Sequence, residues 1–260
     1  MSQMARVFFS FTSLNDGGPA DHRTYNEWHL YDHRPENLAL DGVRWGDRWY
    51  RPTEYRQLSH SGTAYDDTDY VTMYWLREPA EQSLAEWSQL ASDSFQWGRG
   101  PLLPGISRRL LAFFTPVRGY AATRTLVSAD TIPFRPNRGL HVTLWRFANP
   151  SANDTHDHHR WEDRILAPAE LEVPGVAGVW TFSFFEYQHL DALRIAPPRE
   201  AEPGSLRMHV TYLDADPADV TNAIRAVRDS LAGSHRAEPS CDVELLFSAP
   251  LRTIVPFQDW

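Results

Sequence analysis

The residue pattern of the first half of this 260-residue chain returns in the second half after a shift of 133 positions. The shift aligns apolar and aromatic residues with similar residues, and it aligns a proline and a glycine with their own kind. The aligned pairs are Val7/Leu140, Phe9/Val142, Phe11/Leu144, Trp28/Trp161, Pro35/Pro168, Leu38/Leu171, Gly42/Gly175, Val43/Val176, Phe114/Phe247 and Thr115/Ser248. A single shift that holds from the start to the end of the unit indicates an internal duplication of one supersecondary unit.

Each half shows the same order of expected strands and helices. In the first half, β-branched and aromatic runs predict strands, apolar residues at helical spacing predict helices, and Pro35 should end or kink the first helix. The expected strands are 5–14, 43–52, 69–76 and 108–117, and the expected helices lie at about 21–33 and around 84–90. This β-α-β-β-α-β order is that of a ferredoxin-like unit. We predict a first repeat at 1–120, a linker at 121–137 and a second repeat at 138–260.

Composition narrows the range of functions. The net charge is −9 and no cluster of basic residues occurs, so nucleic acid and anionic membranes are not expected as partners. All 25 basic residues are arginine, which excludes Schiff-base, pyridoxal phosphate and P-loop lysine chemistry. The single Cys241 cannot form an internal disulfide, and no run of about 18 apolar residues occurs. We therefore expect a cytoplasmic protein without a membrane span.

The residues around the first expected helix form the pattern W-x4-H-x-P-x6-G-V, carried by Trp28, His33, Pro35, Gly42 and Val43. This pattern, together with the repeated strand order, resembles the helix-to-strand signature of the EthD-like dimeric α+β barrel proteins. In that superfamily two ferredoxin-like units, usually from two chains, pack their sheets face to face into a barrel. The duplication implies that one chain supplies both units here. The predicted fold class is therefore α+β, with two fused βαββαβ repeats forming one barrel.

The resemblance also implies a range of reactions. Relatives of this kind include cofactor-independent polyketide cyclases, lactone isomerases, quinone-forming monooxygenases and, in more distant branches, haem-binding peroxidases and dehydratases. His33 matches the motif histidine and could act as a general acid or base, although a helix-terminal imidazole can also simply cap carbonyls. His29 and Asp32 share its helical stripe and could orient it. In the second repeat, the shift of 133 aligns Glu162 with His29, Ile165 with Asp32 and Leu166 with His33.

The same histidines raise the alternative of a metal site. His29 and His33 are four residues apart, and Glu36 follows within one turn, so the three could ligate zinc or a similar ion. Pro35 interrupts the helix between the histidines and Glu36, which spoils the simple geometry. We predict no metal site.

Polar residues alternate with apolar residues on two expected strands of the second repeat. His141 lies on the first strand of that repeat, and Arg207 and His209 lie on the third. These strands are neighbours in a ferredoxin-like sheet, so the three side chains should share one face. They would form either a ligand pocket or a hydrogen-bonded network between the two sheets, with Glu244 as the available counter-ion.

Aromatic residues gather near the motif in the first repeat. Trp49 and Tyr74 are two of several that would suit an aromatic or polycyclic ligand, although such residues more often form core. Arg48, on the strand after Gly42, could hold a carboxylate or an enolate. The residues predicted to bind substrate are Arg48, Trp49, Tyr74, His141, Arg207 and His209.

These features predict a small-molecule enzyme that uses histidine acid/base chemistry in an aromatic-lined pocket, without an organic cofactor. Cyclisation, isomerisation, dehydration or oxygenation of an aromatic or polyketide-like substrate are the candidate reactions. A haem- or metal-dependent barrel enzyme and a non-catalytic carrier of a small ligand are the alternatives. Self-association into a homo-oligomer is left open.

Overall fold

The computed structural model describes residues 4–15, 17–62, 64–99, 106–188, 201–256 and 258. Its strands are β1 (Met4–Ser13), β2 (Val43–Tyr50), β3 (His60–Ser61), β4 (Tyr70–Arg77), β5 (Ser107–Ala121), β6 (Gly139–Phe147), β7 (Val176–Tyr187), β8 (Leu206–Leu213) and β9 (Val243–Thr253). The long strands follow the order β2-β4-β1-β5-β7-β8-β6-β9 and pair antiparallel. Because β2 also pairs with β9, the sheet closes into a barrel, and the short β3 pairs with β9.

Each repeat contributes one ferredoxin-like sheet to this barrel. The order β2-β4-β1-β5 places the four long strands of the first repeat as second, third, first and fourth, and β7-β8-β6-β9 does the same for the second repeat. The sheets join where β5 pairs with β7 and where β2 pairs with β9. The predicted fold class, two fused βαββαβ repeats in one α+β barrel, is confirmed. The repeat boundaries stay a prediction; β5 ends at Ala121 and β6 begins at Gly139.

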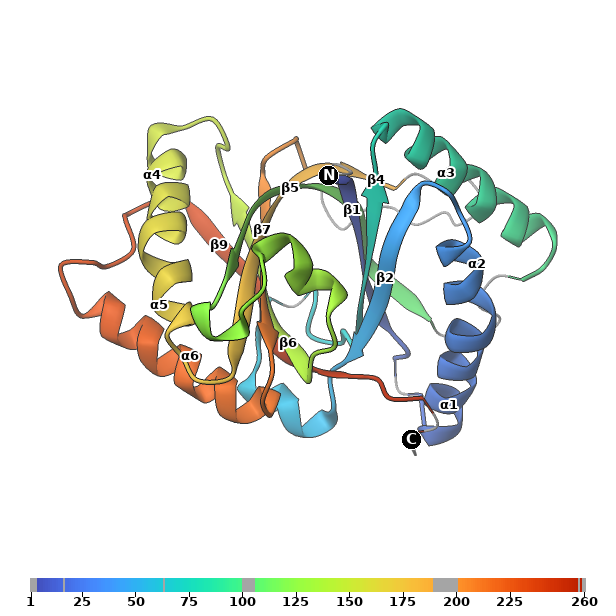
Figure 1. Cartoon of the computed structure of the whole chain (residues 1–260), viewed down its shortest axis with the longest axis horizontal. Coiled ribbons are helices and arrows are strands. Elements are labelled where there is room, and N and C mark those ends of the chain that lie inside the picture. Colours follow the sequence, from blue (N-terminus) through green and yellow to red (C-terminus); the bar gives the residue numbers. More distant parts are fainter. Residues whose placement is uncertain are drawn as a thin grey trace.

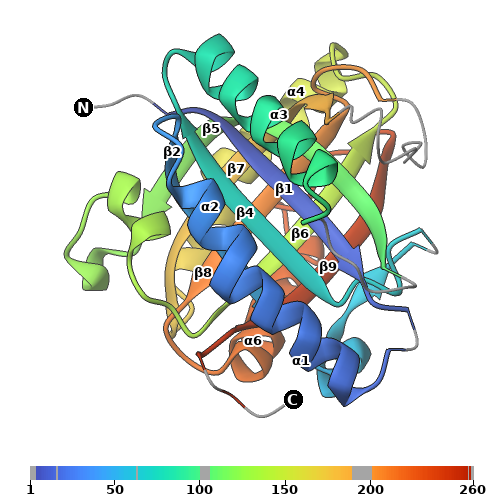
Figure 2. The same ribbon diagram turned by 90° about the vertical axis from the view of Figure 1, so that its right-hand side faces the viewer.

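Helices cover the outside of the barrel on two opposite sides (Figure 1). They are α1 (Pro19–Trp28), α2 (Arg34–Leu38), α3 (Ala80–Gln96), α4 (Asn153–Trp161), α5 (Ala167–Leu171) and α6 (Pro217–Ala232), with π-helical segments η1 (His29–His33) and η5 (Glu162–Leu166) and 3-10 segments η2 (Thr53–Leu58), η3 (Thr123–Thr125) and η4 (Ala129–Phe134). Figure 2 shows α1, α2 and α3 lying across β1 and β4. Among the helices of the described residues, none combines the length and the apolar character needed to cross a membrane.

The barrel interior forms the main hydrophobic core, and a second packed layer lies between the strands and the helices. Phe9 of β1 points inward and packs against Phe182 of β7, with ring centres 5.1 Å apart. Its neighbour Phe8 points outward and packs against Trp87 of α3, with ring centres 4.9 Å apart. Because side chains alternate along a strand, Ser10 also points outward, toward the helices. The outward layer therefore collects the polar side chains of the strands.

The first helix continues past Pro35 to Leu38, so of the two outcomes expected at Pro35, an end or a kink, an end of the helix is wrong. Proline lacks an N–H, and its ring collides with the carbonyl one turn earlier in an α-helix. The chain avoids this collision through a π-turn, in which the N–H of Arg34 bonds to the carbonyl of His29. The segment η5 forms the same turn just before Pro168 in the second repeat. A duplicated irregularity of this kind supports the internal duplication.

The strand register corrects the alignment of the repeats. Thr72 of β4 lies opposite Ser10, and His209 of β8 lies opposite Thr143, the residue that the shift of 133 aligns with Ser10. The shift is therefore 137 in the third strands. The paired residues Arg48 and Thr72 of the first repeat are 24 positions apart, and the corresponding pair Thr181 and His209 is 28 positions apart, so the second repeat has four additional residues between them. The same shift holds in the fourth strands, so the expected pairs Phe114/Phe247 and Thr115/Ser248 are wrong and are replaced by Leu110/Phe247 and Leu111/Ser248.

Candidate functional site

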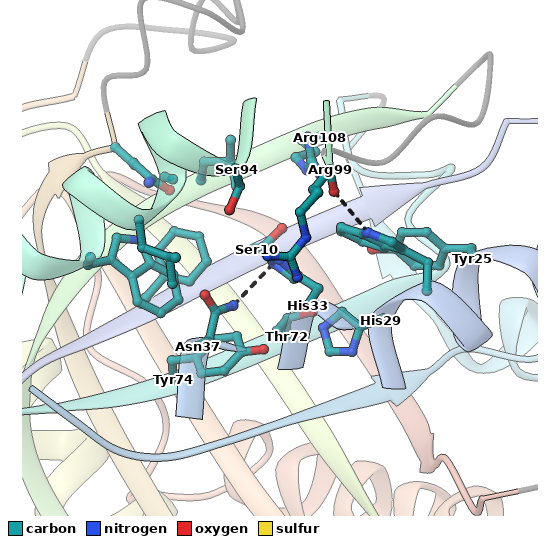
Figure 3. Close-up of a pocket in the computed structure, with 17 residues that line it drawn as sticks. Ser10, Tyr25, His29, His33, Asn37, Thr72, Tyr74, Ser94, Arg99 and Arg108 are labelled. Carbon is teal, nitrogen blue, oxygen red and sulfur yellow. Dashed lines mark hydrogen bonds between the residues drawn. The ribbon is translucent and has the colours of Figure 1, made fainter. Parts of the chain in front are cut away.

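A small cavity lies between the helices and the sheet of the first repeat (Figure 3). Strands β1, β4 and β5 supply one wall, and α1, η1, α2 and α3 supply the other. Its volume is about 80 Å³, which is room for a few water molecules or a small organic group. The lining residues with polar or aromatic side chains include Ser10, Tyr25, Trp28, His29, His33, Asn37, Thr72, Tyr74, Trp87, Ser94, Arg99 and Arg108.

His33, the motif histidine, lines this cavity in a fixed orientation. Its ring stacks on Trp28, with centres 4.6 Å apart and an interplanar angle of 16°. Asn37 donates Nδ2–H to Nε2 of His33 over 3.2 Å, which leaves the ring proton on Nδ1. Burial, together with the positive charges of Arg108 and Arg48, lowers the pKa of His33 to about 3. His33 is therefore a neutral imidazole at physiological pH.

His29 lies beside His33 and has a ring nitrogen without a partner. The side chain is buried, and the two ring centres are 5.5 Å apart. Nε2 of His29 has no hydrogen-bond partner within the described part of the chain. Burial and the charge of Arg48 hold the pKa of His29 well below its usual value. A buried polar atom without a partner is uncommon in folded proteins, so this nitrogen calls for an explanation.

Asp32, which we predicted to orient the catalytic histidine, faces an arginine instead. Its carboxylate pairs with Arg99, whose guanidinium also donates to Glu36 over 2.6 Å. The carbonyl of Arg99 accepts the indole N–H of Trp28 over 3.1 Å. These contacts tie the segment that follows α3 to the first helix and shape one side of the cavity.

Arg108 of β5 also reaches the cavity, and the sequence did not single it out. A β-bulge places it there, because β1 and β5 lose register between Phe11, which pairs with Leu110, and Thr12, which pairs with Arg108. Burial lowers the pKa of Arg108, but a guanidinium stays charged at neutral pH. Its guanidinium forms no ion pair or hydrogen bond with any other described residue. The cavity is therefore electropositive beside the two histidines.

Tyr74, a predicted substrate-binding residue, belongs to the aromatic wall. Its ring packs against Trp87 with centres 5.0 Å apart. Gly46 of β2 makes this position available, because a Cβ there would lie 2.0 Å from the Tyr74 ring. Burial raises the pKa of Tyr74, so its hydroxyl stays protonated and can donate a hydrogen bond.

The corresponding place in the second repeat is filled by buried ion pairs. Glu162 accepts hydrogen bonds from Nε of Arg207 over 2.7 Å and from Nδ1 of His209 over 2.9 Å. Glu170 accepts from Nε2 of His209 over 2.9 Å and from Nη2 of Arg228 over 2.8 Å. Both glutamates and His209 are fully buried. Each charged group of this network therefore has an oppositely charged hydrogen-bond partner within it.

The two glutamates stand where the first repeat has cavity-lining residues. Glu162 corresponds to His29 and Glu170 to Asn37. Burial alone would raise the pKa of Glu162, but its cationic partners lower it to about 2. Burial alone would lower the pKa of His209, but the two glutamates raise it to about 9. At neutral pH the network therefore contains ionised carboxylates around an imidazolium.

The predicted shared face of His141, Arg207 and His209 is confirmed by the β6–β8 register. Of the two arrangements that we predicted for it, the structure forms the network, and the network lies beneath helices rather than between sheets. The expectation that Glu244 is the counter-ion is wrong, since Glu244 pairs with Arg146 over 3.4 Å at the surface.

The side chains of Arg48 and Trp49, adjacent residues of β2, point to opposite sides of the sheet. Trp49 points into the barrel, where its indole N–H donates to Asn137 over 2.9 Å. Arg48 points outward, where its guanidinium lies 4.8 Å from the Tyr25 ring. Arg48 lines a second cavity, and His29 lines both cavities. The structure thus brings Arg48 close to the histidines and separates Trp49 from them.

The residues around the first cavity do not fit a haem. His29 could offer a ring nitrogen as an axial ligand, but a volume of about 80 Å³ is far too small for a tetrapyrrole. The equivalent layer of the second repeat is filled by the buried ion pairs around His209. Within the described ranges, no three His, Cys, Asp or Glu side chains are grouped to hold a metal ion.

Comparisons with solved structures show which proteins share this fold. No family model and no curated protein matches the sequence. A monooxygenase-like protein from Fusobacterium nucleatum superposes with a TM-score of 0.52 at 8% identity, covering 97% of this chain and 94% of that one. The encapsulated DyP-type peroxidase from Mycobacterium smegmatis superposes with a TM-score of 0.51 at 9% identity, covering 99% and 96%. An anthrone oxidase-like protein gives a TM-score of 0.49 at 13% identity, covering 100% and 98%. The first two likenesses show a shared dimeric α+β barrel fold over nearly the whole chain, and membership of the EthD-like branch stays a prediction.

Proposed function

We propose that the first repeat holds an active site for proton transfer, in which His29 removes a proton from a small carbon acid or phenol. Arg108 then stabilises the negative charge of the resulting enolate or phenolate. One observation carries the proposal: a buried neutral imidazole with an unused Nε2 shares a small cavity with an arginine that has no acidic partner among the described residues. A base and a cation around one cavity suit a substrate that becomes negative as it reacts.

The electrostatics of the cavity support this assignment. Arg48 and Arg108 help to keep the histidines neutral, so an unprotonated imidazole is available at neutral pH. In the proposed step the C–H or O–H bond of the substrate breaks, its electron pair stays on the substrate as the enolate or phenolate, and the proton goes to Nε2 of His29. The products are an anion and an imidazolium side by side, which stabilise each other in a site of low dielectric constant. The positive charges of Arg48 and Arg108, which disfavour protonation of the histidines, stabilise the enolate or phenolate that the step produces.

His33 has a positioning role in this scheme. Asn37 occupies its Nε2, so Nδ1–H is the remaining donor of the ring. The stack on Trp28 fixes the ring plane. Tyr74 adds a second neutral donor on the aromatic wall. These groups can orient the carbonyl or hydroxyl oxygen on which the negative charge develops.

The size of the cavity favours a small substrate. An engineered protein cavity of about 150 Å³ holds one benzene molecule, whereas this cavity has about 80 Å³. We therefore expect that only the reacting end of the substrate, smaller than a whole ring, enters this cavity and contacts the histidines. Cyclisation, isomerisation, dehydration and oxygenation can each begin with loss of a proton from a carbon acid or phenol, and this first step needs no organic cofactor.

Hydrogen exchange with solvent tests the proposal before the full reaction is known. The wild-type protein is incubated in D₂O with a panel of small ketones and β-keto acids, and NMR measures the loss of carbon-bound hydrogen. For each compound that the wild type exchanges, we expect His29→Gln to lower the rate by about 100-fold or more while binding persists. His235→Gln, at an exposed histidine, is the matched control and should exchange like the wild type.

Two results would contradict the proposal. Equal exchange by the wild type and His29→Gln would show that this histidine is not the base. Binding of panel compounds by the wild type without any exchange would identify the cavity as that of a carrier.

A further inference from the structure

A second cavity, of about 270 Å³, shares His29 with the first as a lining residue. Residues of the first helix and of β2 form one side, and the segment after β9 forms the other. It contains three arginines, Arg23, Arg34 and Arg48, and an apolar surface of Leu30, Ile254 and Val255. The cavity thus combines a cationic end with an apolar wall.

Arg48 is the unusual group in this cavity. Its side chain is 3% exposed, yet Nε and Nη1 have no hydrogen-bond partner in the described part of the protein. Three of the five N–H donors of a guanidinium are therefore unused. Nη2 donates to Asn26, and the rings of Tyr25 and Tyr70 lie 4.8 and 4.9 Å from the guanidinium carbon. The rings stabilise the positive charge, but their faces do not replace the missing acceptors.

The acidic residues that line this cavity do not neutralise Arg48. The carboxylate of Asp47 accepts the backbone N–H of Arg48 over 2.8 Å and lies 3.8 Å from Nε of Arg34. Glu27 is exposed at the rim. Buried charges are normally paired, and an unsatisfied one indicates that a ligand or ion completes the site.

We propose that this second cavity binds a small organic carboxylate. The carboxylate would accept hydrogen bonds from Arg48, since a guanidinium recognises a carboxylate through paired charge-assisted bonds. The organic part would lie against Leu30, Ile254 and Val255. Pockets that combine an apolar wall with a few placed polar groups are typical of small-molecule sites. This site is separate from the proposed proton-transfer cavity and does not depend on it.

The site belongs to the first repeat alone. The second repeat has Thr181 at the position of Arg48, and the Thr181 hydroxyl donates to the carbonyl of Arg118 over 3.4 Å. Because His29 lines both cavities, a ligand bound in the second cavity should also change the pKa of this histidine. A carboxylate on Arg48 would offset the positive charge that disfavours protonation of His29, so its binding should make His29 more basic.

Benzoate is a suitable probe, with the neutral isostere benzamide as its control at constant ionic strength. We expect benzoate to raise the unfolding temperature of the wild type in step with the logarithm of its concentration above Kd, and benzamide to leave the unfolding temperature unchanged. Arg48→Met should weaken benzoate binding by about tenfold or more, because it removes hydrogen bonds to a charged group. Arg160→Met, which removes an exposed arginine, and Arg108→Met, which alters the first cavity, should both retain benzoate binding.

The proposal is overturned if Arg48→Met binds benzoate as the wild type does, if benzamide binds as well as benzoate, or if binding is lost in Arg108→Met and kept in Arg48→Met. A measurement on the wild type removes any dependence on the folding of variants. The Nε–H NMR resonance of Arg48 should shift on titration with benzoate, and an unchanged resonance would also overturn the proposal. None of these readouts uses turnover, so this site and the proposed active site can fail independently.

Discussion

Replacing Glu170 with glutamine should destabilise the protein strongly, because it removes one carboxylate from a fully buried ion network. In the wild type Glu170 accepts hydrogen bonds from His209, Arg228 and Thr211 at 2.8 to 3.0 Å. Arg228 is partly exposed and can turn to water, but the imidazolium of His209 is fully buried and keeps only Glu162 as a partner. Breaking a buried pair by removing one partner costs about 3–5 kcal/mol. For a chain of this size that corresponds to a fall of roughly 10 °C in the unfolding temperature.

Denaturant unfolding at pH 7, followed by circular dichroism, measures this cost. Asp157→Asn is the matched control, because Asp157 pairs with Arg160 on the surface and such pairs contribute about 0–1 kcal/mol. The double variant Glu170→Gln/His209→Gln completes a cycle. We expect a coupling energy of about 0.5–3 kcal/mol between the two sites, since removal of the histidine relieves the uncompensated charge.

A loss of less than about 1 kcal/mol in Glu170→Gln, equal to the surface control, would refute the reasoning. It would mean that His209 is neutral in the folded protein or that Glu170 is not ionised. The pKa of His209 distinguishes these cases, because the glutamates should hold it near 9 in the wild type and lower in Glu170→Gln.

Two further predictions concern acid stability and packing. Burial lowers the pKa of His141 from 6.5 to about 3, so the unfolded chain takes up a proton there that the folded chain refuses, and the contribution to stability that is present above pH 6.5 is lost as the pH falls toward 3. At pH 4.5 this loss is about 3 kcal/mol, and His141→Gln should show a correspondingly flatter stability curve between pH 8 and pH 4.5; an unchanged slope would contradict the assignment. Gly119→Ala would place a Cβ 2.3 Å from the Trp180 ring and should cost about 1–3 kcal/mol in the free energy of unfolding. Gly233→Ala, whose Cβ would meet no atom closer than 3.8 Å, is its control, and equal stability of the two variants would refute the packing argument.

The fold was largely predictable because the duplication appears in residues that fold the unit. Apolar strands, the motif proline and the glycine before the second strand recur at one shift, and they define a repeat without knowledge of any contact. The shift of 137 in the later strands could not be seen, since β-strands rich in Phe, Leu and Ser align almost equally well four residues apart. The continuation of the helix past Pro35 was missed because a π-turn solves the proline clash without changing the residue pattern.

The candidate site was predictable only in part. The motif pointed to His33, and its neighbour His29 followed from helical spacing. Arg108 was missed because it lies in a basic and apolar strand, where a β-bulge rather than simple alternation determines which side chain faces the cavity. Glu162 and Glu170 are 47 and 39 residues away in sequence from His209. The alignment of the repeats was nevertheless a usable signal, since it placed Glu162 at the position of His29.

The two repeats differ in how the charges of their buried polar layers are paired. In the second repeat, the charges around Glu162 and Glu170 are matched by hydrogen bonds, so their desolvation is offset. In the first repeat, His29, Arg48 and Trp87 keep buried nitrogen atoms without a partner among the described residues. Each such atom lowers stability by about 1–3 kcal/mol, and substitution by an apolar residue of similar shape would remove the penalty. The second repeat also keeps buried atoms without a partner among the described residues, such as Nδ1 of His141, but the buried charges around Glu162 and Glu170 are paired. The contrast therefore lies in the buried charge of Arg48, whose unused donors a ligand would complete.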